Sequence, residues 1–197
     1  MFLQGSMASS DFEFVQMINK YGIEDTQRRC EGKIKALGSG TNAVAYLLPS
    51  GNVARVEHGV NEDGYAMWME KVVMKDKSTM SPKIFHYQVE KDIRSKDYLS
   101  ISIQERLHSI NSDRKAFRTM SSVSYDIAGI LQHKNPEKRW NEVNGSRDFF
   151  KKFAPLVECI KLAEVVKDSG LSLNDTHMGN IMYRKMGDTI VVTDPVN

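Results

Sequence analysis

Apolar and polar residues alternate along the first half of the chain, and this alternation predicts a small sheet. Residues 34–56 show it in three short stretches separated by turn residues at 38–40 and 49–52, which indicates three consecutive strands. Residues 83–89 and 98–104 show the same two-residue period, which places successive side chains on opposite faces of a strand. We therefore expect five strands in this half of the chain.

Longer segments repeat their apolar residues every three to four positions, which is the period of a helix with one buried face. The last of these segments contains Pro155, which should kink the helix or separate its first turns. It closes near Gly170, a residue type that commonly ends helices. Residues 136–139 are polar and predict a loop. The predicted helices span residues 12–21, 65–74, 122–131 and 149–168.

The order of these elements predicts an α+β fold with two lobes. Strands dominate the first half of the chain and helices the second. A chain of 197 residues, of which 41% are hydrophobic, is long and apolar enough for one compact unit or a small pair of domains. We expect residues 11–106 to form an N-terminal segment and the first lobe, and residues 107–197 the second lobe. Residues 1–10 are expected to be an expression-vector remnant or a disordered start.

Composition and charge exclude several classes of partner. The formal net charge is +2, which does not indicate a strong nucleic-acid-binding surface. No apolar run approaches the ~20 residues that a membrane-spanning helix needs, so we expect no membrane partner. Cys30 and Cys159 lie far apart and in no metal-binding spacing, which indicates free thiols in a reducing cytoplasm. No feature of the sequence indicates an oligomeric state.

The strongest chemical signal lies near the C-terminus. Asp175 and Asn180 stand five residues apart as D-x-x-x-x-N, and Asp194 follows a β-like run fourteen residues later. This order is typical of kinase-type phosphotransferases, in which the first acid orients the attacking hydroxyl and the other two residues hold Mg²⁺. The structural alternative is a turn whose Asx side chains bond their own backbone. We favour catalysis by Asp175 and Asn180, with Asn180 and Asp194 as metal ligands.

A second signal lies upstream, where L-G-S-G-T-N-A-V-A-Y separates two predicted strands. Small residues at Gly38, Ser39 and Gly40, followed by Thr41, let a hairpin backbone approach a polyphosphate. Arg55, seventeen residues after Gly38, supplies a cation on the next strand. The structural alternatives are an ordinary hairpin and a solvated surface arginine. The order of the two signals favours a nucleotide-binding site.

These motifs resemble those of protein kinase-like folds and, more closely, those of the early serine/threonine protein kinases of T-seven type podophages. Pro195 stands where most kinases have the Phe of D-F-G, and Arg55 stands where they have a Lys. The resemblance extends over residues 32–197, with the middle third similar only in pattern. It rests on the motifs L-G-S-G-T-N-A-V-A-Y (37–46), D-T-H-M-G-N-I-M (175–182) and T-D-P-V (193–196).

The resemblance implies a kinase-like α+β fold with a small β-rich N-lobe and a shortened, helical C-lobe. It implies an early phage enzyme, in the cytoplasm of a bacterial host, that transfers the γ-phosphate of ATP to serine or threonine residues of host proteins and redirects host metabolism. Mg²⁺ would be the cofactor, and the chain would correspond to the catalytic domain alone. Glu70 would pair with Arg55, with Asp63 as its rival, and Glu105 would lie at the hinge beside the nucleotide.

Two other functions stay open. Arg55 and the short C-lobe also fit a non-catalytic kinase-like module that binds and inhibits a host protein. Asp175, His177 and Asp194 would be the ligands of a metal hydrolase, although the upstream histidines are scattered along the sequence. In the kinase interpretation His177 holds its loop in place.

Overall fold

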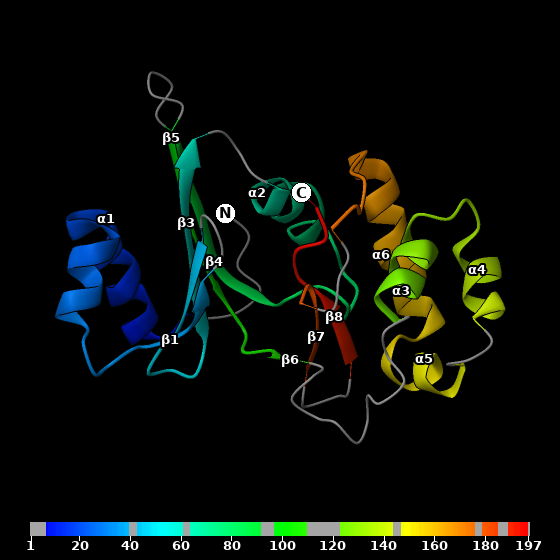
Figure 1. Ribbon diagram of the computed structural model, residues 1–197, viewed down its shortest axis with the longest axis horizontal. Coiled ribbons are helices and arrows are strands. Elements are labelled where there is room, and N and C mark those ends of the chain that lie inside the picture. The colour runs from blue at the N-terminus through cyan, green and yellow to red at the C-terminus, as the bar shows by residue number, and fades with distance from the viewer. Residues whose placement is uncertain are drawn as a thin grey trace. The chain divides into compact units, whose positions relative to one another are not determined.

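In the computed structural model the chain divides into two compact units, and Figure 1 labels most of their helices and strands. The first unit comprises Met1–Glu62 and Lys83–Arg106, and the second comprises Asp63–Pro82 and Leu107–Asn197. The residues that the structure describes are 7–39, 43–60, 64–91, 97–109, 123–143, 147–175, 179–184 and 189–196.

A five-stranded antiparallel sheet forms the centre of the first unit, with the strand order β1-β2-β3-β5-β4. All five strands predicted from the alternation of apolar residues are present. The β1–β2 register shifts between Ala36 and Gly38, so an irregularity lies directly before the glycine turn. The strands are β1 (Lys35–Ser39), β2 (Ala43–Leu47), β3 (Val53–Val60), β4 (Ile84–Lys91) and β5 (Asp97–Gln104).

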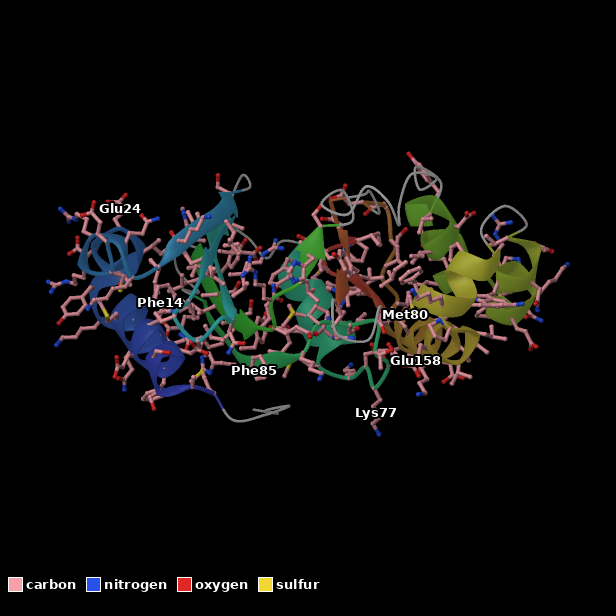
Figure 2. The ribbon with its side chains drawn as sticks, turned by 90° about the horizontal axis from the view of Figure 1, so that it is seen from below. Phe14, Glu24, Lys77, Met80, Phe85 and Glu158 are labelled. Carbon is pink, nitrogen blue, oxygen red and sulfur yellow. The ribbon has the colours of Figure 1, made fainter. Side chains whose placement is uncertain are left out.

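One helix, α1 (Ser9–Arg29), covers one face of this sheet (Figure 1). Its Phe14 side chain points toward the strands, and its ring centroid lies 5.9 Å from that of Tyr46 on β2 (Figure 2). The core under the helix includes Ala54 and Val56 of β3. Because side chains alternate along a strand, the residues between them lie on the opposite face. The helix is longer than the predicted segment 12–21.

The N-terminal turn of α1 is anchored to the β2–β3 turn through a buried carboxylate. Asp11 is fully buried. It accepts hydrogen bonds from Ser50 Oγ at 2.6 Å and from Asn52 Nδ2 at 2.8 Å. The helix is interrupted further along at Gly22, whose φ of 77° lies in the left-handed region that glycine adopts without a steric penalty.

The second unit combines short helices with a three-stranded antiparallel sheet of order β6-β7-β8. Residues 136–139, predicted to form a loop, instead begin the helix α4, because Asn135 caps it by accepting from the Lys138 N at 2.8 Å. The long helix predicted around Pro155 is split there into α5 and α6. The elements are α2 (Gly64–Trp68), the π-helix η1 (Met69–Val73), β6 (His108–Ser109), α3 (Val123–Leu131), α4 (Pro136–Glu142), α5 (Arg147–Phe153), α6 (Leu156–Ser169), β7 (Ile181–Arg184) and β8 (Thr189–Val192).

Residues 63–82, which the sequence analysis assigned to the first lobe, group with the second unit. Apolar packing explains this, because Trp68 and Met69 are fully buried and η1 packs against α6. Met80 extends the same contact: its backbone oxygen accepts from the Val192 N at 2.8 Å, and its Sδ lies 3.6 Å from the Cys159 Sγ. Figure 2 shows Met80 beside α6.

The chain is therefore a mixed α+β protein, with an antiparallel sheet near the N-terminus and mainly helices after it. This confirms the predicted class, while the kinase-like arrangement of the lobes stays a prediction. Both cysteines are free thiols, as expected, and both are buried. Among the helices that the structure describes, none has the length and apolar character to cross a membrane.

Candidate functional site

Hydrogen bonds join the first and last residues of the D-x-x-x-x-N motif, which lies directly before β7. The Asn180 Nδ2 donates to the backbone oxygen of Asp175 at 2.8 Å and to its Oδ2 at 3.2 Å. Such bonds are what a purely structural Asx turn requires. An amide coordinates a cation through its carbonyl oxygen, however, and these bonds use only the nitrogen. The geometry is therefore compatible with both the structural and the metal-binding role.

Asp194 lies two residues after the end of β8, between two residues that are bonded to Asn180 and Asp175. On one side, Thr193 donates to the backbone oxygen of Asn180 through its N at 2.9 Å and its Oγ1 at 3.0 Å. On the other side, the backbone oxygen of Pro195 accepts from the Asp175 N at 3.0 Å. The Asp194 Oδ1 is buried. The structure thus brings together the two acids and the amide that the sequence singled out.

The three side chains offer two carboxylates and one amide carbonyl, all of them oxygen ligands. This set fits a hard cation such as Mg²⁺, which usually takes one or two carboxylates from the protein and completes its shell with water and phosphate oxygens. Within the described parts of the chain, no three side chains of the His, Cys, Asp and Glu types cluster closely enough to hold a metal by themselves. His177, which the hydrolase hypothesis requires, lies outside the described residues. Binding of a metal ion at these side chains stays a prediction.

A residue outside the motifs holds the segment that enters the loop. The side chain of Gln132, which follows α3, accepts from the Leu173 N at 3.1 Å and donates to the Leu173 O at 3.5 Å. Leu173 is 4% exposed and lies two residues before Asp175. Gln132 therefore connects the end of α3 to the position of the candidate catalytic carboxylate.

The glycine motif lies on the β1–β2 hairpin of the first unit. Gly38 and Ser39 are exposed at the end of β1, and Gly40 and Thr41 lie outside the described residues. Among the residues that the structure describes, a Cβ added to Gly38 would have no neighbour within 4 Å, and the φ of Gly38 is outside the left-handed region. Neither packing nor backbone conformation therefore requires a glycine here. The open space fits a hairpin that admits a ligand, and it also fits an exposed turn.

Arg55 forms an ion pair with a carboxylate of its own strand, on the sheet face opposite α1. Its Nε donates to the Glu57 Oε1 at 2.7 Å, and its Nη2 lies 2.5 Å from the same oxygen. The Ser100 Oγ donates to the Glu57 Oε2 at 3.3 Å. The side chain of Arg55 is 21% exposed, whereas that of Glu57 is fully buried. The cation expected to bind phosphate is therefore held by an acid that the sequence analysis did not consider.

Two further predicted residues occupy positions that leave their roles untested. Glu70 is exposed on η1, and its expected pairing with Arg55 stays a prediction. Its rival Asp63 lies outside the described residues. Glu105 follows β5; its Oε1 accepts from the Lys83 N at 2.9 Å, and its own N donates to the Lys83 O at 3.0 Å. These bonds extend the pairing of β4 with β5, so Glu105 has a structural role, and its nucleotide contact stays a prediction.

Sequence reasoning missed Glu57 and Gln132 for different reasons. The pairing of Glu57 with Arg55 could have been predicted, because two residues of opposite charge at positions i and i+2 of a strand share one face. The bonds of Gln132 could not, since its partner lies 41 positions along the chain. A long-range bond between a polar side chain and a backbone leaves no local pattern.

No family model matches the chain, and no curated protein matches it. Its function therefore rests on the chemistry of the residues described above.

Proposed function

We propose that the chain is an ATP- and magnesium-dependent protein serine/threonine kinase with a protein kinase-like fold. The observation that carries the proposal is the convergence of Asp175, Asn180 and Asp194 at the ends of β7 and β8. The antiparallel sheet followed by helices is compatible with this fold. The resemblance of the motifs supports a phage enzyme that acts on host proteins in the bacterial cytoplasm.

In this function Asp175 orients the substrate hydroxyl and accepts its proton as the phosphate is transferred. Asn180 and Asp194 would hold Mg²⁺, which supplies positive charge to the phosphates when it is bound. The backbone bonds of Thr193 and Pro195 fix the distance between these groups. Positioning of this kind accounts for most of the catalysis in phosphoryl transfer, which demands little covalent chemistry from the protein.

The first unit would bind the nucleotide. The backbone of Gly38, Ser39, Gly40 and Thr41 would approach the phosphates, and Arg55 would contact them through its guanidinium. Glu105 would lie beside the purine, and Glu70 would be the helix acid that pairs with the cation. The exposed hairpin and the open space at Gly38 support the phosphate-binding part of this assignment.

One observation favours a second candidate, a non-catalytic kinase-like module that binds and inhibits a host protein. The guanidinium of Arg55 is already paired with the buried Glu57, so a carboxylate of its own strand opposes the attraction of Arg55 for phosphate. This candidate predicts weak or absent nucleotide binding, whereas the kinase predicts binding that depends on magnesium.

The test begins with thermal unfolding in the presence of ATP, with and without magnesium. Ligand at a hundred times its dissociation constant stabilises a native protein by about 2.7 kcal/mol. For a chain of this size that raises the melting temperature by about 5–10 °C. An unchanged melting temperature with saturating ATP and magnesium would contradict the proposed nucleotide site.

Two variants then separate binding from chemistry. Asp175→Asn should abolish the transfer of labelled phosphate to host lysate proteins and to the chain itself, while ATP binding persists, because an amide cannot take the proton. Asp194→Asn should weaken the magnesium-dependent part of ATP binding, because a neutral amide is a poorer ligand for a hard cation. Parent-level transfer by the Asp175 variant contradicts the catalytic assignment. ATP binding without transfer by the parent chain favours the non-catalytic module.

A further inference from the structure

The pair formed by Arg55 and Glu57 is the most deeply buried contact between opposite charges described in the first unit. Glu57 has no exposed surface and accepts hydrogen bonds from both Arg55 and Ser100. A carboxylate in that position needs a compensating charge, because removing the partner of a buried ion costs several kcal/mol. Arg55 therefore cannot leave Glu57 at low cost in order to bind another anion.

We infer that Glu57 sets how strongly this site attracts nucleotide phosphate, by holding Arg55 in a neutral pair. This inference rests on the proposed function, in which Arg55 contacts the phosphates. Successive residues on one face of a strand lie about 7 Å apart, so phosphate bound at Arg55 would also lie near the carboxylate. Glu57 then acts twice: it cancels the charge of Arg55 and it repels the phosphate. The result is a site with reduced affinity for polyphosphates.

A purely structural ion pair predicts a different outcome from an attenuating one. If Glu57 only stabilises the sheet, its neutralisation lowers the melting temperature and leaves ATP binding unchanged or weaker. If Glu57 attenuates the site, its neutralisation strengthens ATP binding. The sign of the change in affinity therefore distinguishes the two roles, whatever happens to stability.

Glu57→Gln is the appropriate variant. Glutamine has the same shape and keeps a carbonyl oxygen that can accept the Arg55 Nε hydrogen bond. The Arg55 side chain is 21% exposed, so its released charge can be solvated in the variant. A change of one unit charge at about 7 Å near a protein surface alters affinity by about tenfold or more. We expect the dissociation constant for ATP with magnesium to fall by at least that factor.

Three control measurements test whether the change in ATP affinity acts through the phosphates and through Arg55. Adenosine, which has no phosphates, should bind the parent and Glu57→Gln equally. Arg55→Met combined with Glu57→Gln should lose the gain, because the gain needs the released guanidinium. Ser100→Ala, which removes the neutral bond to the other carboxylate oxygen, should leave the affinity for ATP unchanged.

Calorimetric titration with ATP and magnesium measures the dissociation constants of the parent and Glu57→Gln, and each result supports or overturns the inference. Tighter binding by Glu57→Gln than by the parent, lost in the double variant, supports the attenuating role. ATP binding by Glu57→Gln but not by the parent supports it as well, with the site closed in the parent. Binding by the parent that Glu57→Gln leaves equal or weaker overturns the inference while the proposed function stands. Absence of binding by both proteins overturns the inference and the nucleotide site together.

Discussion

Gln132 offers a test of whether the helical unit positions the catalytic loop. In Gln132→Ala the Leu173 backbone loses the side chain that bonds its N at 3.1 Å and its O at 3.5 Å. Losing the partner of a buried backbone group costs about 1–3 kcal/mol, and the bond at 3.5 Å contributes little of this because it is long. We expect the free energy of unfolding to fall by about 1–2 kcal/mol, which lowers the melting temperature by about 2–8 °C.

The functional consequence follows from the short distance along the chain to Asp175. A small displacement of a catalytic group, of about 1 Å, can reduce a rate by as much as ~100-fold. We therefore expect Gln132→Ala to reduce the turnover of phosphate transfer by tenfold or more, while the affinity for ATP is largely retained. Single-turnover transfer and equilibrium titration with ATP measure the two quantities separately.

Gln132→Glu is the matched control for this prediction. It keeps an oxygen that accepts the 3.1 Å bond, and it puts a carboxylate oxygen, in place of the donor, opposite the Leu173 O. Its side chain is exposed, so the new charge is solvated. It should therefore lose less stability and less turnover than Gln132→Ala, because it keeps the shorter bond. Parent-like stability and turnover in Gln132→Ala would refute the role assigned to this side chain, as would an equal loss in both variants.

Two further predictions concern the glycine hairpin and a buried thiol. Gly38→Ala should keep the parent melting temperature but weaken ATP binding, because the added Cβ has room among the described residues and projects into the space proposed for phosphate. Gly51→Ala should lower the melting temperature and leave ATP binding unchanged, because a φ of 89° is strained for alanine. Burial raises the pKa of the Cys159 thiol to about 12, so the folded chain keeps the proton at pH values where the unfolded thiol, with a pKa of about 9, has lost it. Stability measured by urea unfolding should therefore fall as the pH rises above about 9, and Cys159→Ala should lack this part of the fall; an equally steep fall in the variant would contradict the assignment.

Local pattern predicted the strands well because their signals are short and regular. The alternation in residues 34–56 and the turn residues within it were enough to locate β1, β2 and β3. Helix α4 was missed because residues 136–139 are polar. Its formation depends on the cap at Asn135 and on burial of Trp140 further along, which is 7% exposed. Periodicity alone could not reveal a helix whose buried surface is mostly one large side chain.

Long-range contacts account for the rest of what the sequence could not predict. Residues 63–82 follow the first three strands in sequence, yet their apolar side chains pack in the second unit. The candidate catalytic residues were singled out by their spacing in the sequence, and their role stays a prediction. Their supporting bonds could not be predicted, because Thr193 and Pro195 act through backbone groups that any residue possesses.

Pro195 helps to hold the two acids of the candidate site at a fixed spacing. A proline has a fixed φ and no N–H, so it restricts the backbone immediately after Asp194. Its carbonyl oxygen accepts from the Asp175 N, while Thr193 on the other side is bonded twice to Asn180. The segment that carries the second acid is thus fastened on both sides to the loop that carries the first. In most kinases the corresponding position is a phenylalanine whose packing distinguishes active from inactive states. In the proposed kinase, a proline whose carbonyl oxygen is bonded to the Asp175 N would instead favour one fixed arrangement.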